Sequence, residues 1–281
     1  MARRAGSEPQ ASEIRGPGAA PAQSRLSACI ITLDEADRIE ACLGSLAFCD
    51  ELLVVDSHST DATRERAATC GARVIERDWP GYVAQKEFAI RQARHDWVLC
   101  LDADERVSPE LRRAIEGLRA AGFPGRAGWR MPRLSRYLGR WIRHGTWYPD
   151  LQLRLFDRRR GRWAGLDPHD RVEVDGPVGR LAGPLLHEPY RNLEEHLATI
   201  DRYTTIRARE LFAHGRRARL FDLALRPAWR FLRFYLLTGG FLEGWRGFLL
   251  ACLAAHYAQL KYAKLWLLAH GEAAAGTPET Q

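Results

Sequence analysis

Short apolar runs and amphipathic stretches alternate over the N-terminal part of this chain. The apolar runs have the length and composition of buried β-strands, and they lie at residues 27–33, 51–55, 73–76 and 97–101. Between the runs, apolar residues recur at the three- and four-residue intervals of one helix face. Strands that alternate with helices in this way predict right-handed βαβ units, and therefore a parallel sheet.

The pattern becomes irregular after residue 118. Short strand-like runs at 128–131, 151–156 and 172–174 are separated there by Gly, Pro, Trp and Arg. This texture predicts a mixed, loop-rich half that completes the site and receives a second substrate. A polar helix is then predicted over residues 192–212. Together these elements indicate an α/β fold that is followed by helices.

The stretch at residues 226–268 is both basic and strongly apolar. Arg226, Arg230 and Arg233 share one helix face, aromatic and leucine side chains supply bulk, and Gly239-Gly240 interrupts the helix. No apolar run reaches the ~18 residues that a membrane-spanning helix needs. Basic, aromatic helices are typical of the plane of a membrane interface, although a buried helical hairpin or a dimer contact has a similar composition. We therefore predict an amphipathic helical tail that docks on a membrane surface.

Composition narrows the class of protein. The chain has 281 residues, with 46% hydrophobic and 27% charged side chains, which is an ordinary globular mixture. Its net charge of +7 comes almost entirely from arginine, because Lys86, Lys261 and Lys264 are the only lysines among 42 basic residues. We attribute this ratio to GC-rich coding rather than to selection for phosphate contacts. The six cysteines form no Cys-Xaa-Xaa-Cys pair, which indicates reduced core residues in a cytosolic protein.

Four segments are predicted along the chain. Residues 1–24 are a disordered tail, because they are rich in Ala, Gly, Pro and Arg and lack the apolar core of a signal peptide. Residues 25–190 form the catalytic domain, and residues 191–270 form a helical membrane-interface region. Residues 271–281 are a second disordered tail.

Acidic side chains follow three of the four predicted parallel strands. They are Asp34 and Glu35, then Asp56, and then Asp102 and Asp104. In an open α/β sheet, the carboxyl ends of the strands form the edge at which ligands bind. Asp102 and Asp104 can share a divalent cation, although acids at this position are also found where a helix begins. Three acidic strand ends together favour a ligand that brings its own cation, such as a metal-bound diphosphate.

Other motifs limit the ligand class. Lys86 lies on the helix before the fourth strand. In so arginine-rich a chain, a lysine suggests that a compact point charge is needed at this position. A solvated helix face would explain the presence of Lys86 equally well. No Gly-Xaa-Gly-Xaa-Xaa-Gly follows the first strand and no Gly-Lys-Ser/Thr loop is present, which argues against a dinucleotide oxidoreductase and a P-loop enzyme. Without an aromatic–basic ribonucleoprotein pattern or zinc spacing, we expect no nucleic-acid partner.

The motifs, taken in order, resemble those of family 2 glycosyltransferases with the GT-A fold. Matching segments of the first half are Thr-Leu-Asp-Glu at 32–35, residues 54–61, residues 82–86 and Leu-Asp-Ala-Asp-Glu at 101–105. Later segments, at 147–150, 152–156, 183–187, 240–248 and 260–266, are similar to the bacterial lipopolysaccharide core β-1,4-glucosyltransferases. The resemblance covers about residues 25–268. It implies a Rossmann-like sheet that binds a nucleotide sugar.

The resemblance also implies roles for single residues. The residues it assigns to the nucleotide-sugar donor are Thr32, Glu35, Asp56, Lys86 and Asp102. Asp102 and Asp104 would hold a divalent cation, Mg²⁺ or Mn²⁺, on the donor diphosphate. Asp170 would be the base that takes the acceptor proton.

Two positions depart from the family pattern. Pro168-His169-Asp170 stands where the family usually has Val-His-Glu, so the carboxylate is one methylene shorter. Asp34 stands where the family usually has Asn.

The function that the resemblance implies is a metal-dependent, inverting transfer of a sugar. We expect glucose to move from a UDP-linked donor to a membrane glycolipid such as the lipopolysaccharide inner core. The protein is expected in the cytoplasm, bound peripherally to the inner membrane surface. The alternatives are a polyprenyl-phosphate sugar synthase, which shares the donor half, and a non-catalytic, membrane-associated nucleotide-binding protein.

Overall fold

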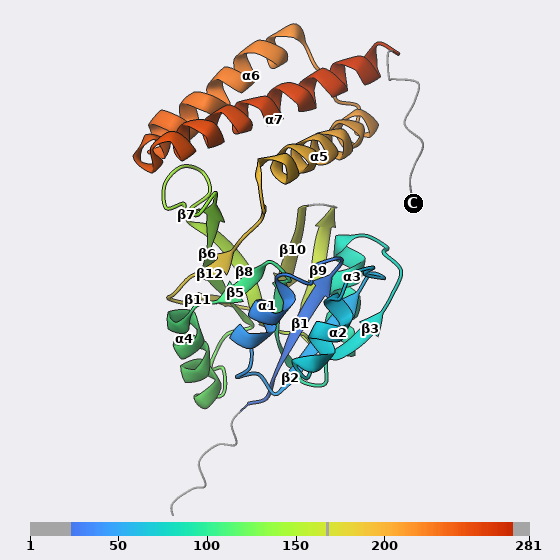
Figure 1. Cartoon of the computed structure of the whole chain (residues 1–281), viewed down its shortest axis with the longest axis vertical. Coiled ribbons are helices and arrows are strands. Elements are labelled where there is room, and N and C mark those ends of the chain that lie inside the picture. The colour runs from blue at the N-terminus through green and yellow to red at the C-terminus, as the bar shows by residue number, and fades with distance from the viewer. Residues whose placement is uncertain (1–23, 167–168, 272–281) are drawn as a thin grey trace, which may run out of the picture.

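The structure, a computed structural model, describes residues 24–166 and 169–271 (Figure 1). The tails predicted at 1–24 and 271–281 therefore lie almost entirely outside the described residues. The predicted α/β class is confirmed, because helices flank a large sheet and three further helices follow it.

The parallel part of the sheet agrees with the prediction from the apolar runs. Its strands are β1 (Leu26–Thr32), β2 (Glu51–Asp56), β3 (Arg73–Glu76) and β4 (Trp97–Asp102). They lie in the order β3-β2-β1-β4, and every neighbouring pair is parallel. Thr32 pairs with Asp56, and Ile31 pairs with Asp102. The acidic ends of these strands consequently meet at one edge.

Antiparallel strands extend the sheet beyond β4. β8 (Asp150–Asp157) pairs with β4, and β6 (Gly128–Tyr137) pairs with β8. The short strands of this half are β5 (Glu105–Val107), β7 (Arg140–Trp141), β11 (Val178–Arg180) and β12 (Leu185–His187). A separate hairpin is formed by β9 (Gly161–Leu166) and β10 (His169–Val174). The second half is thus mixed, as the irregular pattern predicts.

Helices cover both faces of the sheet. The helices are α1 (Ile39–Ser45), α2 (Thr63–Thr69), α3 (Tyr82–Gln92) and α4 (Pro109–Ala120). Along β1, Ala28 and Ile30 pack on the side of α1, α2 and α4, whereas Cys29 and Ile31 pack on the side of α3 and the hairpin. This alternation buries β1 on both faces, which explains its continuous apolar sequence.

The C-terminal helices gather at one end of the molecule (Figure 1). They are α5 (Leu193–Ala213), α6 (Leu220–Leu232), the π-helix η1 (Arg233–Leu237), the 3-10 helix η2 (Gly240–Glu243) and α7 (Trp245–Ala269). The predicted interruption at Gly239-Gly240 is confirmed. A Cβ on Gly240 would lie 2.5 Å from the carbonyl oxygen of Phe234, so the chain turns here only with glycine.

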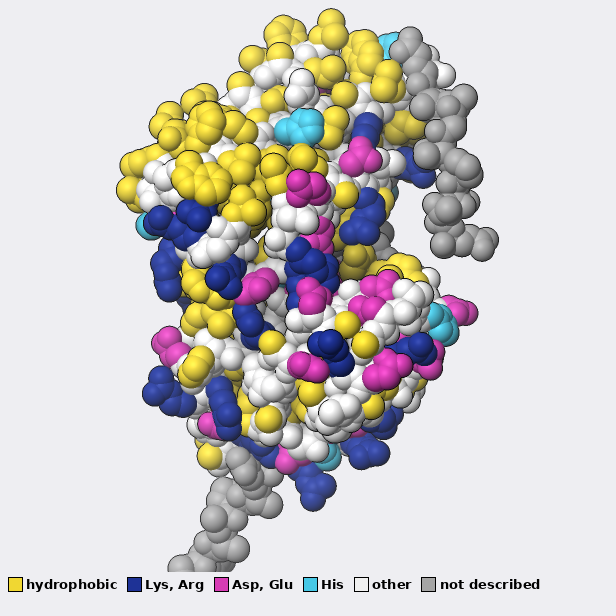
Figure 2. Space-filling model, viewed as in Figure 1, with side chains coloured by type: hydrophobic (Ala, Val, Ile, Leu, Met, Phe, Trp, Pro, Cys, Tyr) yellow, Lys and Arg dark blue, Asp and Glu magenta, His cyan; other side chains and the backbone are white. Residues whose placement is uncertain are grey.

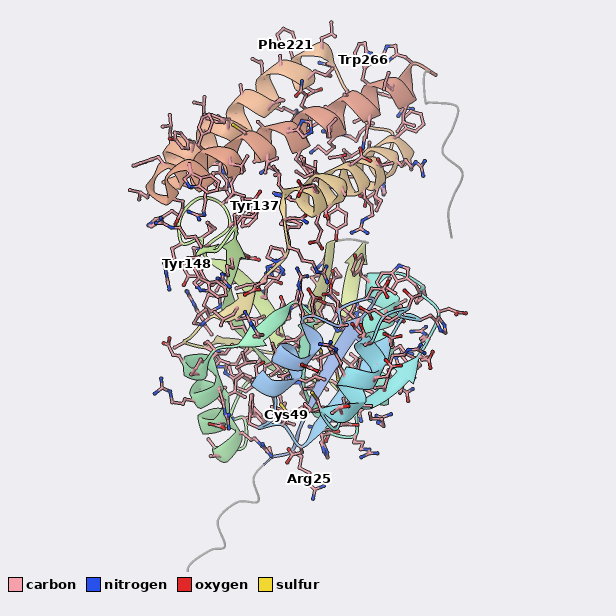
Figure 3. The ribbon with its side chains drawn as sticks, viewed as in Figure 1. Arg25, Cys49, Tyr137, Tyr148, Phe221 and Trp266 are labelled. Carbon is pink, nitrogen blue, oxygen red and sulfur yellow. The ribbon has the colours of Figure 1, made fainter. Side chains whose placement is uncertain are left out.

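These helices are anchored to the sheet rather than attached as a loose tail. Phe234 and Leu250 are buried in one cluster with Tyr137 at the end of β6 (Figure 3). Oε1 of the buried Glu243 accepts hydrogen bonds from the backbone N–H groups of Arg143 at 2.9 Å and His144 at 3.0 Å. Within residues 24–166 and 169–271, no helix is long and apolar enough to cross a membrane.

Candidate active site

A cleft of about 940 Å³ opens at the carboxyl edge of β1 and β4. The strand-end residues Thr32, Glu35, Asp102 and Asp104 lie on its wall. The opposite wall is formed by α5, including Tyr203. The cleft therefore crosses the boundary predicted at residue 190, because the first C-terminal helix is part of it.

Lys86 joins two carboxylates at the bottom of this cleft. It is only 6% exposed, and its Nζ lies 2.8 Å from Oδ1 of Asp102 and 2.8 Å from Oδ2 of Asp170. Nη2 of Arg154 donates to the other oxygen of Asp102 at 2.9 Å. Burial acts to raise the pKa of Asp102, but the charges of Lys86 and Arg154 outweigh it and hold this pKa well below its usual range. Two fixed cations thus converge on the Asp-Xaa-Asp segment.

Asp104 has a different environment. Its Oδ2 lies 3.4 Å from Nε2 of His187, the last residue of β12. Its Oδ1 is buried and has no hydrogen-bond partner in the described structure. Burial acts to raise the pKa of Asp104, and the neighbouring His187 lowers it overall. A buried carboxylate oxygen without a partner, beside an imidazole, is a set of donors that suits a divalent cation.

The described side chains do not form a complete cation site. Within the described ranges, no three His, Cys, Asp or Glu side chains come together as a metal site. Both oxygens of Asp102 are engaged, one by Lys86 and one by Arg154, so its role as a cation ligand stays a prediction. Mg²⁺ characteristically uses one or two carboxylates together with substrate phosphates, and Asp104 with His187 fits that pattern.

The loop after β1 is locked onto the loop after β2. Asp34 has a φ of +52°, and its Oδ1 accepts a hydrogen bond from the backbone N–H of Thr60 at 2.8 Å. The backbone N–H of Glu35 donates to Oγ1 of Thr63 at 2.8 Å. Asn and Asp are the non-glycine residues that most readily adopt a left-handed φ. This requirement explains why Asp34 can replace the expected Asn.

Glu35 is held in the cleft by two arginines. Its Oε2 lies 3.4 Å from Arg38 and 3.0 Å from Arg191, which also pairs with Asp37 and Glu195. Burial raises the pKa of Glu35 to about 7, against the opposing effect of the two arginines. Arg191 thereby connects the strand-end loop to the start of α5.

Comparison with known proteins identifies the family of this chain. The model of glycosyl transferase family 2 matches residues 27–173. Over 248 residues, the chain is 34% identical to the lipopolysaccharide core biosynthesis glycosyltransferase LpsC of Rhizobium meliloti (strain 1021), covering 86% of this chain and 92% of that protein. The chain belongs to glycosyltransferase family 2.

Other relatives of the transferase are similar over the same extent. An uncharacterized glycosyltransferase of Rickettsia typhi is 32% identical over 254 residues, with 86% of each chain covered.

A solved structure is similar over a shorter stretch. It is that of glucosyl-3-phosphoglycerate synthase from Mycobacterium tuberculosis, in complex with Mn²⁺, UDP and glucosyl-3-phosphoglycerate, and it is 27% identical. That match covers 42% of this chain and 46% of the synthase, with a TM-score of 0.35. The transferase therefore spans less than half of the synthase. The parallel and antiparallel sheet of the transferase is the GT-A arrangement expected from its motifs.

Most of the residues predicted for the transferase site lie together. The residues on the wall of the cleft are Thr32, Glu35, Lys86, Asp102, Asp104 and Asp170. Oγ1 of Thr32 is buried, and no described group hydrogen-bonds it. Asp56 lies behind the wall instead: it is fully buried, and both of its oxygens bind Ser59. A nucleoside contact for Asp56 stays a prediction.

Two residues of the site have no donor-side role assigned from the sequence. His187 and Arg154 each lie in a segment that matches the family, but neither is assigned to the donor or the cation. Both reach the cleft through sheet pairing, because β8 places Arg154 beside β4 and β12 places His187 beside β5. The signal that could have found His187 was a single histidine after a short apolar run.

Proposed function

We propose that this transferase moves glucose from a UDP-linked donor to a membrane glycolipid, such as the lipopolysaccharide inner core, with inversion at the anomeric carbon. One observation carries the proposal. The carboxylate of Asp170, the residue assigned as the base, is held by Lys86 beside the Asp-Xaa-Asp segment, within a single cleft. This arrangement supports a proton acceptor next to a diphosphate site.

The donor is held by the strand-end edge. Thr32 and Glu35 contact the nucleoside, with Asp56 fixing the loop behind them. Lys86 and Arg154 supply positive charge at the bottom of the cleft, where the diphosphate lies. Asp104 and His187, together with Asp102, would hold Mg²⁺ or Mn²⁺, which neutralises charge on the leaving diphosphate when it is bound.

Asp170 takes the proton in the transfer step. The acceptor hydroxyl oxygen bonds to the anomeric carbon while the bond from that carbon to the diphosphate oxygen breaks. The hydroxyl proton passes to the carboxylate of Asp170, and the electron pair of the broken bond leaves with the nucleoside diphosphate. Because one displacement occurs at the anomeric carbon, an α-linked donor gives a β-linked product.

The exposed hydrophobic surface supports a membrane-bound acceptor. Figure 2 shows hydrophobic side chains gathered over the end of the molecule formed by α6 and α7. We call this surface the apolar face; its exposed residues are Leu220, Phe221, Leu225, Trp229, Leu232, Leu236, Leu237, Phe241, Leu242, Trp245 and Phe248. Phe221, labelled in Figure 3, is 74% exposed. So large an exposed apolar surface is typical of a membrane or partner contact.

The proposal assigns the two parts of the chain different tasks. Residues 25–190 bind the donor and carry the base, and residues 191–270 dock on the cytoplasmic face of the inner membrane, where nucleotide sugars are available. The enzyme is accordingly a peripheral one, which presents its cleft to a glycolipid headgroup.

A transfer assay tests this function. The full chain is incubated with UDP-glucose, Mn²⁺ and either lipopolysaccharide inner-core glycolipid or a polyprenyl phosphate, and UDP release and product linkage are measured. We expect UDP release with the glycolipid and a β-glucosidic product by NMR. Transfer to the polyprenyl phosphate alone would contradict the acceptor, and release from a different nucleotide sugar alone would contradict the donor.

A further inference from the structure

A second cavity, of about 220 Å³, lies between α5 and α7. Tyr190, Thr199 and Tyr203 line both this cavity and the cleft, so the two spaces adjoin. Oη of Tyr203 is 3.4 Å from Oη of Tyr82 on α3, which also lines the cleft. The cavity therefore adjoins the cleft on its α5 side, opposite the strand ends that are proposed to hold the donor.

The wall of the cavity is largely aromatic. Its rings belong to Trp147, Tyr190, His196, Tyr203 and Tyr257. The ring of Tyr190 stacks on that of His196, with 4.0 Å between centroids. Burial lowers the pKa of His196 to about 4, so this imidazole is neutral near pH 7. Flat, uncharged rings with hydroxyl groups at their edges suit a sugar ring, which has apolar C–H faces and a polar rim.

Two basic side chains without acidic partners lie near these rings. Arg230 of α6 lines the cavity, and Lys261 lies one turn beyond Tyr257 on α7, with its Nζ 6.0 Å from that ring. Neither residue forms an ion pair within the described part of the chain. The nearby Arg207 and Arg226 are paired with Glu210 and Asp222, respectively.

Burial and the surrounding positive charge act on Lys261 in the same direction. Burial lowers its pKa to about 8, and Arg230, Arg207 and Arg226 act in the same direction. Lys261 is partly buried, whereas Arg230 is exposed. A partly buried cation without a counter-charge costs free energy, and a bound anion relieves that cost. The cavity thus combines a surface for a ring with a site for a negative group.

We propose that this cavity binds an anionic sugar of the acceptor, a residue that carries a phosphate or a carboxylate group and neighbours the sugar to be glucosylated. The inference rests on the proposed function and specifies the chemistry of its acceptor. The volume suits one sugar unit, since it is smaller than the ~300 Å³ at which drug-sized pockets begin. Acyl chains have a different place, because the apolar face lies on the outside of the helices.

The test uses a water-soluble acceptor, so that membrane binding does not affect the measured kinetics. Deacylated lipopolysaccharide core oligosaccharide serves as the anionic probe; one sample is dephosphorylated and another is carboxyl-reduced, which separates the two sources of charge. The variants are Arg230→Gln, Lys261→Gln and their combination, with Arg209→Gln as the matched control. Arg209 is exposed on α5 and has no partner among the described side chains.

For the double variant, we expect the acceptor KM to rise about 10- to 100-fold, because charge-assisted hydrogen bonds are lost, while kcat and UDP-glucose hydrolysis change little. Removing the relevant acidic group from the acceptor should abolish the difference between this variant and the unmutated enzyme. An unchanged KM, or an equal rise on acceptor lacking both acidic groups, would overturn the inference.

A binding measurement separates this inference from the proposed function. Calorimetry without donor should give tighter binding of the anionic oligosaccharide by the unmutated chain than by the double variant. If that difference is found while no nucleotide sugar supports transfer, the proposed function fails and the anion site stands. If transfer occurs and the two affinities are equal, the anion site fails alone.

Discussion

Nζ of Lys86 lies 2.8 Å from Oδ2 of Asp170, although the two residues are 84 positions apart in the chain. The same nitrogen is 2.8 Å from Oδ1 of Asp102. A single buried lysine therefore fixes the distance between the proposed base and the segment proposed to bind the diphosphate. The contact arises because the β9–β10 hairpin packs on α3.

Removing this lysine should damage the fold as well as the activity. Lys86→Met leaves Asp102 and Asp170 without their shared partner, and breaking a buried ion pair in this way typically costs about 3–5 kcal/mol. We expect the free energy of unfolding in urea to fall by that order. The control is Arg91→Met on the same helix, whose exposed ion pair with Glu87 should contribute less than about 1 kcal/mol. Equal losses for the two variants would contradict the bridging role.

The cation is expected to depend on Asp104 and His187. Asp104→Asn and His187→Gln should each reduce the gain in UDP affinity that Mn²⁺ produces, by at least about tenfold, because a ligand of a site with few protein donors is lost. Calorimetry with Mn²⁺ and with EDTA measures this gain. Affinity in EDTA should stay near that of the unmutated chain, and a full Mn²⁺ effect in both variants would disprove the assignment.

Donor affinity should depend on pH through Glu35. Burial holds its pKa at about 7, above the ordinary value of 4.5, so the folded chain binds this proton more tightly than the unfolded chain does. The resulting contribution to stability is greatest below pH 4.5 and is lost as the pH rises through 7. If the ionised carboxylate accepts a hydrogen bond from the nucleoside, UDP-glucose affinity should rise about tenfold from pH 6 to pH 8.

Glu35→Gln provides the control for that pH dependence. The amide does not titrate, so the affinity of this variant for UDP-glucose should be nearly flat over the same range. UDP-glucose is the appropriate ligand, because its diphosphate diester is already fully ionised and does not titrate near neutral pH. A slope that persists in Glu35→Gln would assign the titration to another group.

Membrane binding should be lost when the apolar face is made polar. Combining Phe221→Ser, Trp229→Ser and Leu237→Ser removes three side chains that are each more than half exposed, so folding should be little affected. We expect the variant to be released from anionic liposomes in a sedimentation assay. The control is Leu151→Ser on β8, a side chain that is 37% exposed and lies outside the apolar face. This variant should remain bound to the liposomes. Salt should weaken the liposome binding of the unmutated protein only in part, because screening acts on charges and not on buried apolar area.

Truncating the tail is not an equivalent experiment. Phe234, Leu250 and Leu265 are buried against α5 and the end of β6. Deleting residues 226–281 would expose that core, so a loss of liposome binding could follow from unfolding alone. The three surface substitutions on α6 and η1 avoid this ambiguity, because they leave these buried side chains in place.

The sequence predicts those parts of the fold that depend on local periodicity. The strands that end at Thr32, Asp56 and Asp102 are recognisable, because apolar runs give way to acids at each end. The proximity of Lys86 to Asp170 is not visible in this way, since it depends on how a hairpin packs against a helix. His187 reaches Asp104 through pairing of β12 with β5 and β6, which no periodicity encodes. The burial of Asp56 by Ser59 likewise depends on the conformation of its loop.

The role of Asp170 as the base is tested most directly by single-turnover kinetics of Asp170→Asn with UDP-glucose and a saturating glycolipid acceptor. A positioned base contributes ~10²- to 10⁴-fold, so the transfer rate should fall by that order while UDP-glucose affinity stays nearly constant. Asp170→Glu should keep most of the activity, because it retains a carboxylate. Glu173→Gln, on the same strand but paired with Arg171 and Arg162, is the control and should transfer at the unmutated rate. Transfer by Asp170→Asn at the unmutated rate, with a large loss in Glu173→Gln, would contradict this account.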